Sequence, residues 1–233
     1  DVELVYLPGL PGESISTETE DILLEVSGDF VLASALNSHG GHISLVIGGN
    51  LTLEEDGNIY TAGGSLDIDV AGDFIMQDQT TASTEGGNIR TDVDGVMTLT
   101  GLDASGGEEG PGDISLHAAS IVDGGDVQTD LVGENVRLQV GDGAGDSGDN
   151  LETEMDTFSA ASGSGGLFIS EKDDLTIGTV QAVTVNRVAA DGTLSDLEDE
   201  AAQSGIVSDS AGDIVVTTQG DLNVEQSVST TGA

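Results

Sequence analysis

Apolar residues recur at every second position in short runs along most of the chain. Ile43, Leu45 and Ile47 form one such run, and a second begins at Leu66. A period of two is typical of β-strands that bury one face. In each copy a glycine turn and a second short apolar run follow. The copies open at these positions: Ile22, Ile43, Leu66, Ile89 and Ile214.

Pairs of glycines give the repeat its length. They fall at residues 40–41, 63–64 and 86–87, 23 residues apart, with a further pair at 106–107. If each unit makes one turn of a solenoid, equivalent positions stack about 4.8 Å apart and inward side chains form ladders. The sequence therefore predicts an all-β fold, a parallel β-helix with about 23 residues per coil and seven to nine coils. The handedness of parallel crossovers predicts a right-handed helix.

The repeat also predicts which residues lie above one another. One inward ladder is expected to contain Ile22, Ile43, Leu66, Ile89 and Ile214, and another Phe30, Leu51, Phe74 and Leu222. Leu45, Ile68 and Thr91 are expected to be vertically aligned. This alignment is the proposition on which the rest of the interpretation depends.

The register is open between residues 107 and 140. Ile114 and Val127 both resemble the start of an opening strand, but they lie 13 residues apart, too few for a coil. We favour Val127, because the turn at residues 133–135 and the run from Val136 to Leu138 then complete the pattern. The alternative places the opening strand at Ile114.

Two insertions are expected within a single β-helix segment spanning residues 1–233, near residues 141–166 and 188–211. In the first, Leu151, Met155 and Phe158 have the i, i+4, i+7 spacing of a short amphipathic helix. In the second, residues 195–198 read as a capping box for a helix that ends near Gln203. We therefore expect two short helical insertions on the flank of the solenoid.

Charge changes the picture of possible partners. The 233 residues include 44 Asp and Glu against 4 Lys and Arg, a formal net charge of −40, and no cysteine. Such a chain repels phosphate backbones and anionic lipid headgroups, so we expect no nucleic-acid partner. No apolar run approaches the roughly 20 residues of a membrane span, so no membrane insertion is expected. Cations are the natural counterpart.

Acidic residues offer two kinds of cation site. Asp142, Asp146 and Asp149 lie in a glycine-rich loop, and carboxylates on such a turn suit Ca²⁺, which accepts six to eight oxygen ligands. The alternative is a solvated Gly-Asp loop. A second set occupies the same turn in successive coils. The favoured interpretation is that these residues suit the turn conformation, and the alternative is that they form stacked cation sites. That set is Asp29, Asn50, Asp73 and Asp221.

Catalytic chemistry finds little support. His39 and His42 flank a glycine turn, and His117 has no assigned position near them, so we expect solvent-facing histidines in preference to a transition-metal site. A polysaccharide lyase needs a basic group beside its acidic ligands. The four basic residues are scattered over different units: Arg90, Arg137, Lys172 and Arg187. We therefore expect no enzyme.

The repeat resembles the β-helical shaft of filamentous-haemagglutinin-like exoproteins, large surface adhesins of Gram-negative bacteria. The coils that carry the resemblance run from Gly41 to Leu53 and from Gly64 to Phe74, each a strand, a Gly-Asn or Gly-Asp turn and an apolar pair. The likeness covers about two thirds of the chain and is a pattern without a signature motif. It implies a secreted stalk or adhesin at the cell surface, with no catalytic residues to transfer.

The expected function is a structural or adhesive segment of a secreted, extracellular surface fibre whose acidic exterior is screened by divalent cations. Its expected partners are itself or the rest of its parent chain, end to end, and a host or neighbouring cell surface or its glycans. The final residues, 229–233, stand where a new coil would begin, so we expect a fragment or subunit of a larger fibre. The alternatives are a self-assembling filament subunit and a β-helix polysaccharide lyase or hydrolase.

Overall fold

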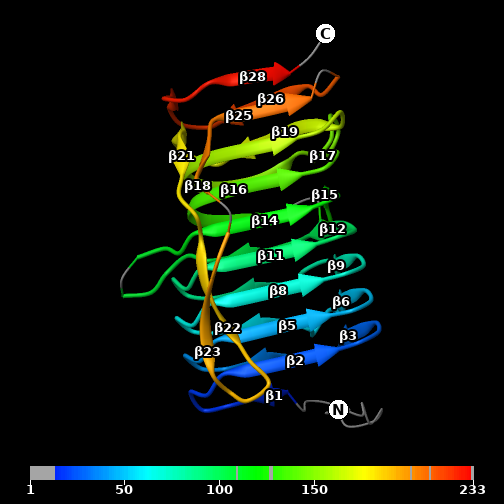
Figure 1. The fold of residues 1–233 in the computed structure, drawn as a ribbon. Coiled ribbons are helices and arrows are strands. Elements are labelled where there is room, and N and C mark those ends of the chain that lie inside the picture. The colour runs from blue at the N-terminus through cyan, green and yellow to red at the C-terminus, as the bar shows by residue number, and fades with distance from the viewer. Residues whose placement is uncertain (1–13, 109, 126–127, 200, 210, 232–233) are drawn as a thin grey trace.

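The chain is a stack of parallel β-coils. The computed structural model describes residues 14–108, 110–125, 128–199, 201–209 and 211–231. Within these residues the regular secondary structure is all β, in a solenoid of about nine turns spaced roughly 23 residues apart (Figure 1). The predicted all-β parallel β-helix is confirmed. Among the described residues, no helix is long and apolar enough to cross a membrane.

Each of the first coils contributes one strand to each of three faces. The first face contains β2 (Ile22–Val26), β5 (Ile43–Ile47), β8 (Leu66–Val70), β11 (Ile89–Val93), β14 (Ile114–Ala118) and the second half of β16 (Leu131–Val140). The second face contains β3 (Phe30–Leu32), β6 (Leu51–Leu53), β9 (Phe74–Met76), β12 (Val96–Leu99), β15 (Ser120–Asp123) and β17 (Gly143–Ala144). The third face contains β1 (Ile15–Ser16), β4 (Leu36–Asn37), β7 (Ile59–Tyr60), β10 (Ala82–Ser83), β13 (Leu102–Asp103) and the first half of β16.

The core is built from ladders of equivalent side chains. Leu45 lies opposite Ile68 in the parallel register, and Ile68 lies opposite Thr91, so the predicted vertical alignment is confirmed. All three side chains are buried. Alternation along each strand directs one apolar set inward, and the neighbouring coils supply the backbone hydrogen bonds. The hydrophobic core therefore runs the length of the stack.

The repeated glycine pair has a separate reason for each glycine. Gly63 has a φ of +107°, a conformation that side chains with a Cβ rarely adopt. Gly64 has an ordinary φ, but a Cβ on it would collide with the backbone carbonyl of Gly41 in the preceding coil. The first glycine makes the turn and the second lets adjacent coils approach, which explains why the pair recurs once per coil.

The predicted ladders are correct at the amino-terminal end and wrong near the other end. Ile22, Ile43, Leu66 and Ile89 share one ladder, and Phe30, Leu51 and Phe74 share the other. Ile214 instead lies opposite Leu167, which stacks on Ala144 of the second face, and Leu222 lies opposite Leu175. The strand-turn-strand pattern fits more than one corner of a coil, so the same sequence pattern recurs on another face.

The preferred register between residues 107 and 140 is also wrong. β14 begins at Ile114 and pairs with β11, so Ile114 is the start of the opening strand. Val127 lies outside the described residues. Val136 lies opposite Ile114 one coil later. The coil from Ile89 to Ile114 is 25 residues long, because a loop at residues 104–112 lengthens it.

Neither predicted helix forms among the residues that the structure describes. Residues 151–162 form the long strand β18 (Leu151–Ser162), which pairs with β16. Leu151, Thr153 and Met155 are buried in alternation, and a buried threonine within an apolar set gave the false helical spacing. The supposed capping box lies in β23 (Leu194–Glu198), which pairs antiparallel with β22 (Thr184–Val188). Here the neighbouring strand supplies the hydrogen bonds that a helix would have made internally.

The final coils contain one segment that leaves the stack, residues 178–205, which we call the arm. It lies between β20 (Leu175–Ile177) and β25 (Ile206–Asp209), both of which pair with β18. The arm contains the β22–β23 hairpin and the short pair β21 (Thr179–Val180) and β24 (Gln203–Ser204). The remaining strands of the stack are β19 (Gly166–Glu171), β26 (Ile214–Thr218), β27 (Leu222–Val224) and β28 (Val228–Thr231). In Figure 1 the hairpin lies across the strands of the first face.

Candidate functional site

The three acidic residues predicted to bind a cation stay in one loop but do not converge. Asp146 and Asp149 pair through their backbones, and the Asp146 Oδ1 atom accepts a hydrogen bond from the Gly148 amide at 2.7 Å. The Asp142 Oδ1 atom accepts a hydrogen bond from Ser164 at 3.2 Å. All three side chains are exposed. Asp146 therefore has a role in closing the loop itself.

A different set of carboxylates does converge. Among the described residues, Asp123, Asp130 and Glu152 each place one carboxylate oxygen so that these atoms lie within 4.8 Å of one another. Asp123 ends β15, Asp130 immediately precedes β16, and Glu152 lies in β18 of the following coil. We call these three residues the carboxylate cluster.

Sequence reasoning missed this cluster because Asp123 and Asp130 lie in the segment whose register was open, and Glu152 lies in the segment that was expected to be helical. A signal was present: Asp123 and Asp130 flank one glycine turn, and Glu152 follows Asp130 by 22 residues, close to one coil.

Burial sets the electrostatics of the carboxylate cluster. The side chain of Asp130 is fully buried, and burial, followed by the negative charges of its neighbours Asp123, Glu152 and Asp149, raises its pKa to about 8. Burial and the charge of Asp123 also raise the pKa of Glu152. One hydrogen bond acts to lower the pKa of Asp130, since the Glu152 amide donates to Asp130 Oδ2 at 2.9 Å.

Two oxygens of the carboxylate cluster have no hydrogen-bond partner. They are Asp130 Oδ1 and Glu152 Oε2, both inaccessible to solvent. A buried carboxylate oxygen without a donor or a counter-ion is costly. The cluster thus has both the charge and the unfilled coordination that a cation would satisfy.

Glu171 shows how the same fold satisfies a buried carboxylate without a cation. Its Oε2 atom accepts a hydrogen bond from the Thr153 hydroxyl at 2.7 Å, and its Oε1 atom accepts from the backbone amides of Lys172 and Asp173. Burial is the main cause that raises the pKa of Glu171 to about 7. Every oxygen of this carboxylate therefore has a donor, in contrast to the carboxylate cluster.

The stacked turn residues serve the backbone. Asp29 Oδ1 accepts a hydrogen bond from the Asn50 amide at 2.8 Å, and Asn50 Oδ1 accepts from the Asp73 amide at 2.9 Å one coil later. Asp221 lies apart from this stack, and its amide donates to Asp174 Oδ1 at 2.6 Å. These hydrogen bonds give a physical reason for the favoured interpretation, in which the residues suit the turn, because each side chain accepts a hydrogen bond from an amide of the next coil.

The three histidines are not brought together. His39 Nδ1 lies 2.7 Å from the Thr17 carbonyl oxygen, whereas the Ser65 amide donates to His42 Nδ1 at 2.9 Å. His117 Nδ1 lies 2.7 Å from Asp92 Oδ1 on the outer side of the first face. Burial acts to raise the pKa of Asp92, but hydrogen bonding to His117 and the charge of Arg90 hold that pKa below its ordinary value.

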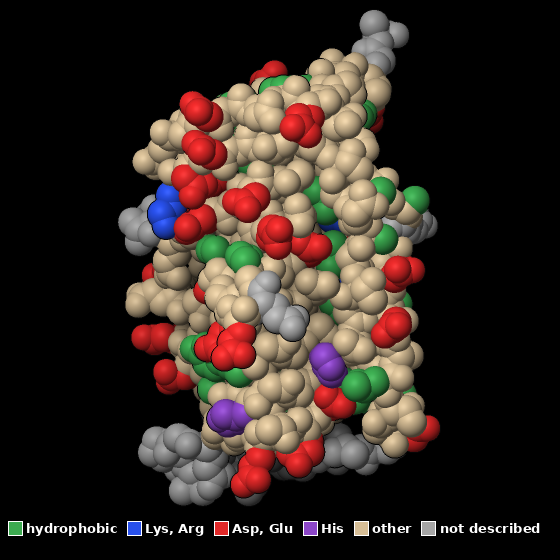
Figure 2. Space-filling view, turned by 90° about the vertical axis from the view of Figure 1, so that its left-hand side faces the viewer, with side chains coloured by type: hydrophobic (Ala, Val, Ile, Leu, Met, Phe, Trp, Pro, Cys, Tyr) green, Lys and Arg blue, Asp and Glu red, His purple; other side chains and the backbone are tan. Residues whose placement is uncertain are grey.

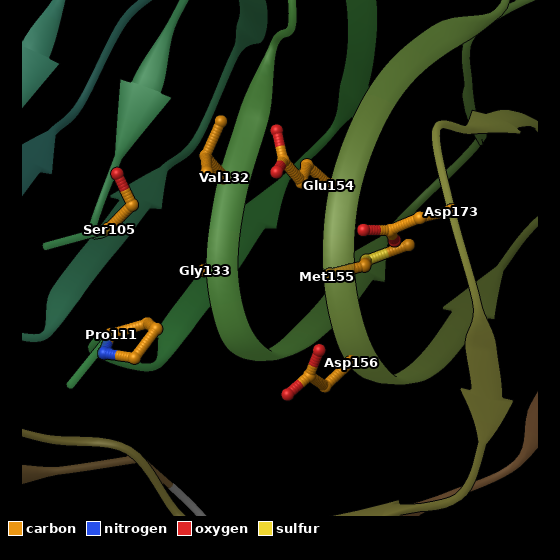
Figure 3. A pocket seen from close by; sticks show the side chains of 8 residues that line it. All are labelled: Ser105, Pro111, Val132, Gly133, Glu154, Met155, Asp156 and Asp173. Atoms are coloured by element: carbon orange, nitrogen blue, oxygen red, sulfur yellow. The ribbon is translucent and has the colours of Figure 1, made fainter.

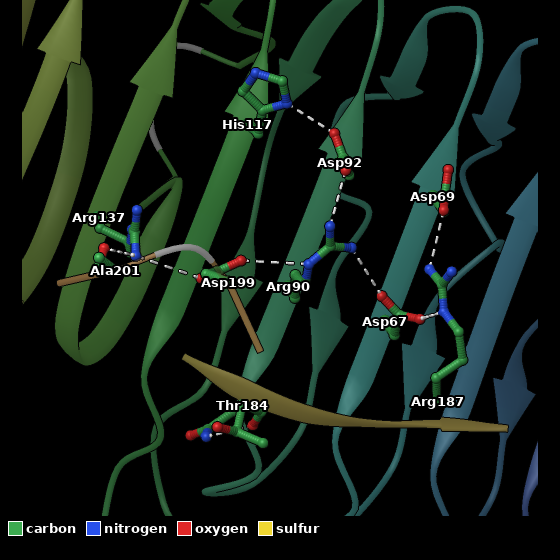
Figure 4. Close-up of polar contacts among 11 residues, drawn as sticks. Asp67, Asp69, Arg90, Asp92, His117, Arg137, Thr184, Arg187, Asp199 and Ala201 are labelled. Atoms are coloured by element: carbon green, nitrogen blue, oxygen red, sulfur yellow. Dashed lines mark hydrogen bonds and ion pairs between the residues drawn. The ribbon is translucent and has the colours of Figure 1, made fainter. Parts of the chain in front are cut away.

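Three of the four basic residues meet beneath the arm (Figure 4). Asp67 is fully buried and accepts from two arginines: Arg187 Nε of the arm at 2.5 Å and Arg90 of β11 at 3.2 Å. Arg90 Nε also lies 3.3 Å from Asp199 of the arm, and an Arg137 nitrogen lies 3.9 Å from the other Asp199 oxygen. The arginines that looked scattered in the sequence therefore join the arm to the solenoid.

Hydrogen bonds and apolar contacts extend this attachment. The amides of Asn186 and Val188 each donate to a serine hydroxyl of the first face, Ser65 and Ser44 respectively, at 2.9 Å. Val185 is fully buried, and Val188 is nearly so. Ser44, Asp67 and Arg90 occupy one outward row in the parallel register, so polar outward positions here form a docking surface for the arm.

The hollow drawn in Figure 3 is small and acidic. Its volume is about 130 Å³, below the roughly 300 Å³ at which ligand pockets begin. Its lining residues are Ser105, Pro111, Val132, Gly133, Glu154, Met155, Asp156 and Asp173. It offers carboxylates at its rim and a single thioether, without a basic or aromatic side chain among its lining residues.

The surface carries far more carboxylates than the protein can pair. Lys172, the fourth basic residue, lies 2.6 Å from Glu154, so all four basic side chains already have a carboxylate partner. Figure 2 shows Asp and Glu side chains over most of the height of one face. The chain has 44 acidic residues against 4 basic ones, so an excess of 40 acidic residues has no basic side chain to pair with.

The last described coil exposes side chains that belong to the inward ladders. Leu222 and Val224 lie opposite Leu175 and Ile177, which are buried, yet they are themselves 47% and 54% exposed. Val228 lies opposite the buried Ile206 and is 44% exposed. An apolar ladder thus continues to this end of the stack without a covering layer among the described residues.

No family model, curated protein or solved structure matches this chain. The fold established above is that of a β-solenoid, which is compatible with a β-helical shaft.

Proposed function

We propose that this chain is a rod segment of a secreted fibre at a cell surface, similar in its role to the shaft of filamentous-haemagglutinin-like adhesins. The observation that carries the proposal is the continuation of the apolar ladders to Leu222, Val224 and Val228, which remain exposed. In a solenoid, each coil buries its apolar edge against a neighbouring coil or a capping repeat. A further coil, from the same fibre or from a second copy, is the kind of partner that would cover these side chains.

The adhesive part of the proposal is supported by the outer side of the second face. Val31, Thr52, Ile75, Thr98 and Val122 form one outward row in the parallel register. The three apolar members are exposed. A flat row of apolar and hydroxyl groups on a rigid sheet is suited to contact a cell surface or its glycans.

The cation part is supported by the charge balance. Self-repulsion among unpaired carboxylates destabilises a compact chain, and salt or divalent ions relieve it. Chelating calcium at low ionic strength should therefore lower the melting temperature. An unchanged melting temperature would remove divalent screening from the proposal and leave the fibre part to be judged separately.

Electron microscopy of the purified chain tests the fibre part. We expect elongated rods, and the substitutions Leu222→Glu and Val224→Glu together should abolish any end-to-end contact between them by placing charge on the exposed ladder. Val31→Glu is the matched control, since Val31 is 52% exposed but lies on a lateral face. Globular particles, or association that Leu222→Glu with Val224→Glu leaves intact, would contradict the proposal.

The same observation supports a second candidate, a self-assembling filament subunit, because a second copy can supply the covering coil. Sedimentation of the isolated chain separates the two. Polymers that grow with protein concentration indicate the filament subunit, whereas single rods indicate a segment that needs its fibre.

A further inference from the structure

The carboxylate cluster is the one place among the described residues where three acidic side chains converge, and two of its buried oxygens lack a donor. Acidic residues are common on this surface, so convergence alone would mean little. Asp130 is fully buried, and its Oδ1 atom, like Glu152 Oε2, has no hydrogen-bond partner. These unpartnered oxygens are the independent observation that points to a ligand.

Other carboxylates of the chain show that the fold does not generally leave a buried carboxylate oxygen without a donor. Asp29 and Asp73 also accept an amide from the next coil, but the first is exposed and the second half-buried. Glu171 is buried, but hydroxyl and amide donors reach both of its oxygens. In contrast to these, Asp130 combines complete burial with an oxygen that no donor satisfies.

The chain does not supply a basic partner there. Arg90, Arg137 and Arg187 are bound in the arm network, and Lys172 is paired with Glu154. Neutralisation must therefore come from protons or from a cation. Oxygen-only ligands select a hard cation over a transition metal.

Calcium is favoured among the hard cations. Mg²⁺ gives up its water reluctantly and is usually held by one or two carboxylates, whereas this site offers three and Ca²⁺ accepts six to eight oxygen ligands. The three oxygens lie within 4.8 Å of one another. One Asp123 oxygen is held in place by the Gly125 amide at 2.7 Å, and Asp149 contributes further negative charge nearby.

We propose that Asp123, Asp130 and Glu152 bind one Ca²⁺ ion, with water completing its coordination, and that this ion joins two successive coils. Asp123 and Asp130 come from one coil, and Glu152 comes from the next coil. The ion thereby fixes the stacking of the two coils at this level. The site deepens the divalent-cation part of the proposed function and does not depend on the fibre part.

Isothermal titration of the chelator-treated full chain with CaCl₂ at physiological ionic strength and pH 7.5 tests the site. We expect one saturable site with a Kd of about 10⁻⁷ to 10⁻⁴ M, above a weak background from the acidic surface. Saturating calcium should raise the melting temperature by about 5–10 °C at a hundredfold excess over Kd. Asp130→Asn should weaken the saturable site at least tenfold.

Two controls make the result specific. Glu171→Gln alters a buried carboxylate that already has its donors, and Asp142→Asn alters an exposed one, so both should change the Kd by less than twofold. Circular dichroism of Asp130→Asn verifies that it folds. If it does not, crystals of the unaltered chain grown with calcium must show anomalous density about 2.4 Å from the three carboxylates.

Several results would overturn the proposal. They are the absence of a saturable site, equal binding by Asp130→Asn, and a lack of density at the cluster. Each would mean that protons neutralise the cluster. A failure of this kind is distinguishable from a failure of the fibre proposal, which electron microscopy decides without reference to calcium.

Discussion

Asp67→Asn should release the arm from the solenoid. Asp67 is completely buried and is shared by Arg187 at 2.5 Å and Arg90 at 3.2 Å. An asparagine of the same shape retains one acceptor oxygen but turns an amide group with two N–H donors toward the other guanidinium. Arg187 keeps one further carboxylate, Asp69, and Arg90 keeps two, Asp92 and Asp199.

The size of the effect follows from these contacts. A hydrogen bond to a charged group contributes about 1.5–3 kcal/mol, and removing one partner of a buried ion pair costs about 3–5 kcal/mol. Because each arginine retains a second carboxylate, we expect the lower end, about 3 kcal/mol. That corresponds to roughly a hundredfold increase in the equilibrium constant for arm opening.

Amide hydrogen exchange measures this opening directly. The amides of Asn186 and Val188 donate to serine hydroxyls of the first face, so they exchange when the arm lifts. Their protection should fall about a hundredfold in Asp67→Asn, with the coil strands unaffected. The matched control is Asp69→Asn, which removes an exposed partner of the same arginine and should cost about 0.2–1 kcal/mol. Protection in Asp67→Asn within threefold of the unaltered chain, or equal losses in both variants, would refute the reasoning.

Three further predictions concern the stack. Gly64→Ala should destabilise the chain by about 1–3 kcal/mol in urea unfolding, because its Cβ would collide with the Gly41 carbonyl, whereas Gly28→Ala, which meets nothing within 4 Å, should be close to neutral; equal effects would contradict the packing argument. Asn50→Asp places a third charge between Asp29 and Asp73 and should lower stability by about 1–2 kcal/mol at low salt, a loss that high salt must diminish. For Glu171, the folded pKa of about 7 lies above the ordinary value of 4.5, so the stability contributed by its protonated form is lost as the pH rises from about 4.5 to 7. The melting temperature of Glu171→Gln relative to the unaltered chain should therefore rise over that pH range, and a constant difference would show that this carboxyl is not the titrating group.

The first coils could be predicted from the sequence because each level of description agrees there. Period-two strands, turn residues and the spacing of glycine pairs all give the same 23-residue unit, and Leu45, Ile68 and Thr91 lie where that unit places them. The same reasoning failed for the later coils. Ile214 follows the pattern of Ile22 but lies on another face, because adjacent corners of a coil accept the same strand-turn-strand sequence.

The two false helices and the missed carboxylate cluster share a cause. A spacing along the chain cannot reveal which residues a neighbouring coil or strand will satisfy. Thr153 is buried in β18 and donates a hydrogen bond to Glu171. A polar residue therefore occupies an inward position that the spacing of apolar residues did not indicate. Asp130 and Glu152 converge only once the register of β16 and β18 is known. The arm is similar, because its arginines meet Asp67 only after the solenoid has formed.

Cysteine cross-linking tests the stacking of coils most directly, and the chain has no cysteine of its own to interfere. Thr52 and Ile75 are outward partners in adjacent coils, and Thr98 lies one coil further. Parallel strands about 4.8 Å apart satisfy disulfide geometry, but two coils, at about 9.6 Å, do not. A chain with Thr52→Cys and Ile75→Cys should therefore form an intramolecular disulfide under mild oxidation, and one with Thr52→Cys and Thr98→Cys should not. Failure of the first pair, or equally fast cross-linking of the second, would contradict the 23-residue solenoid.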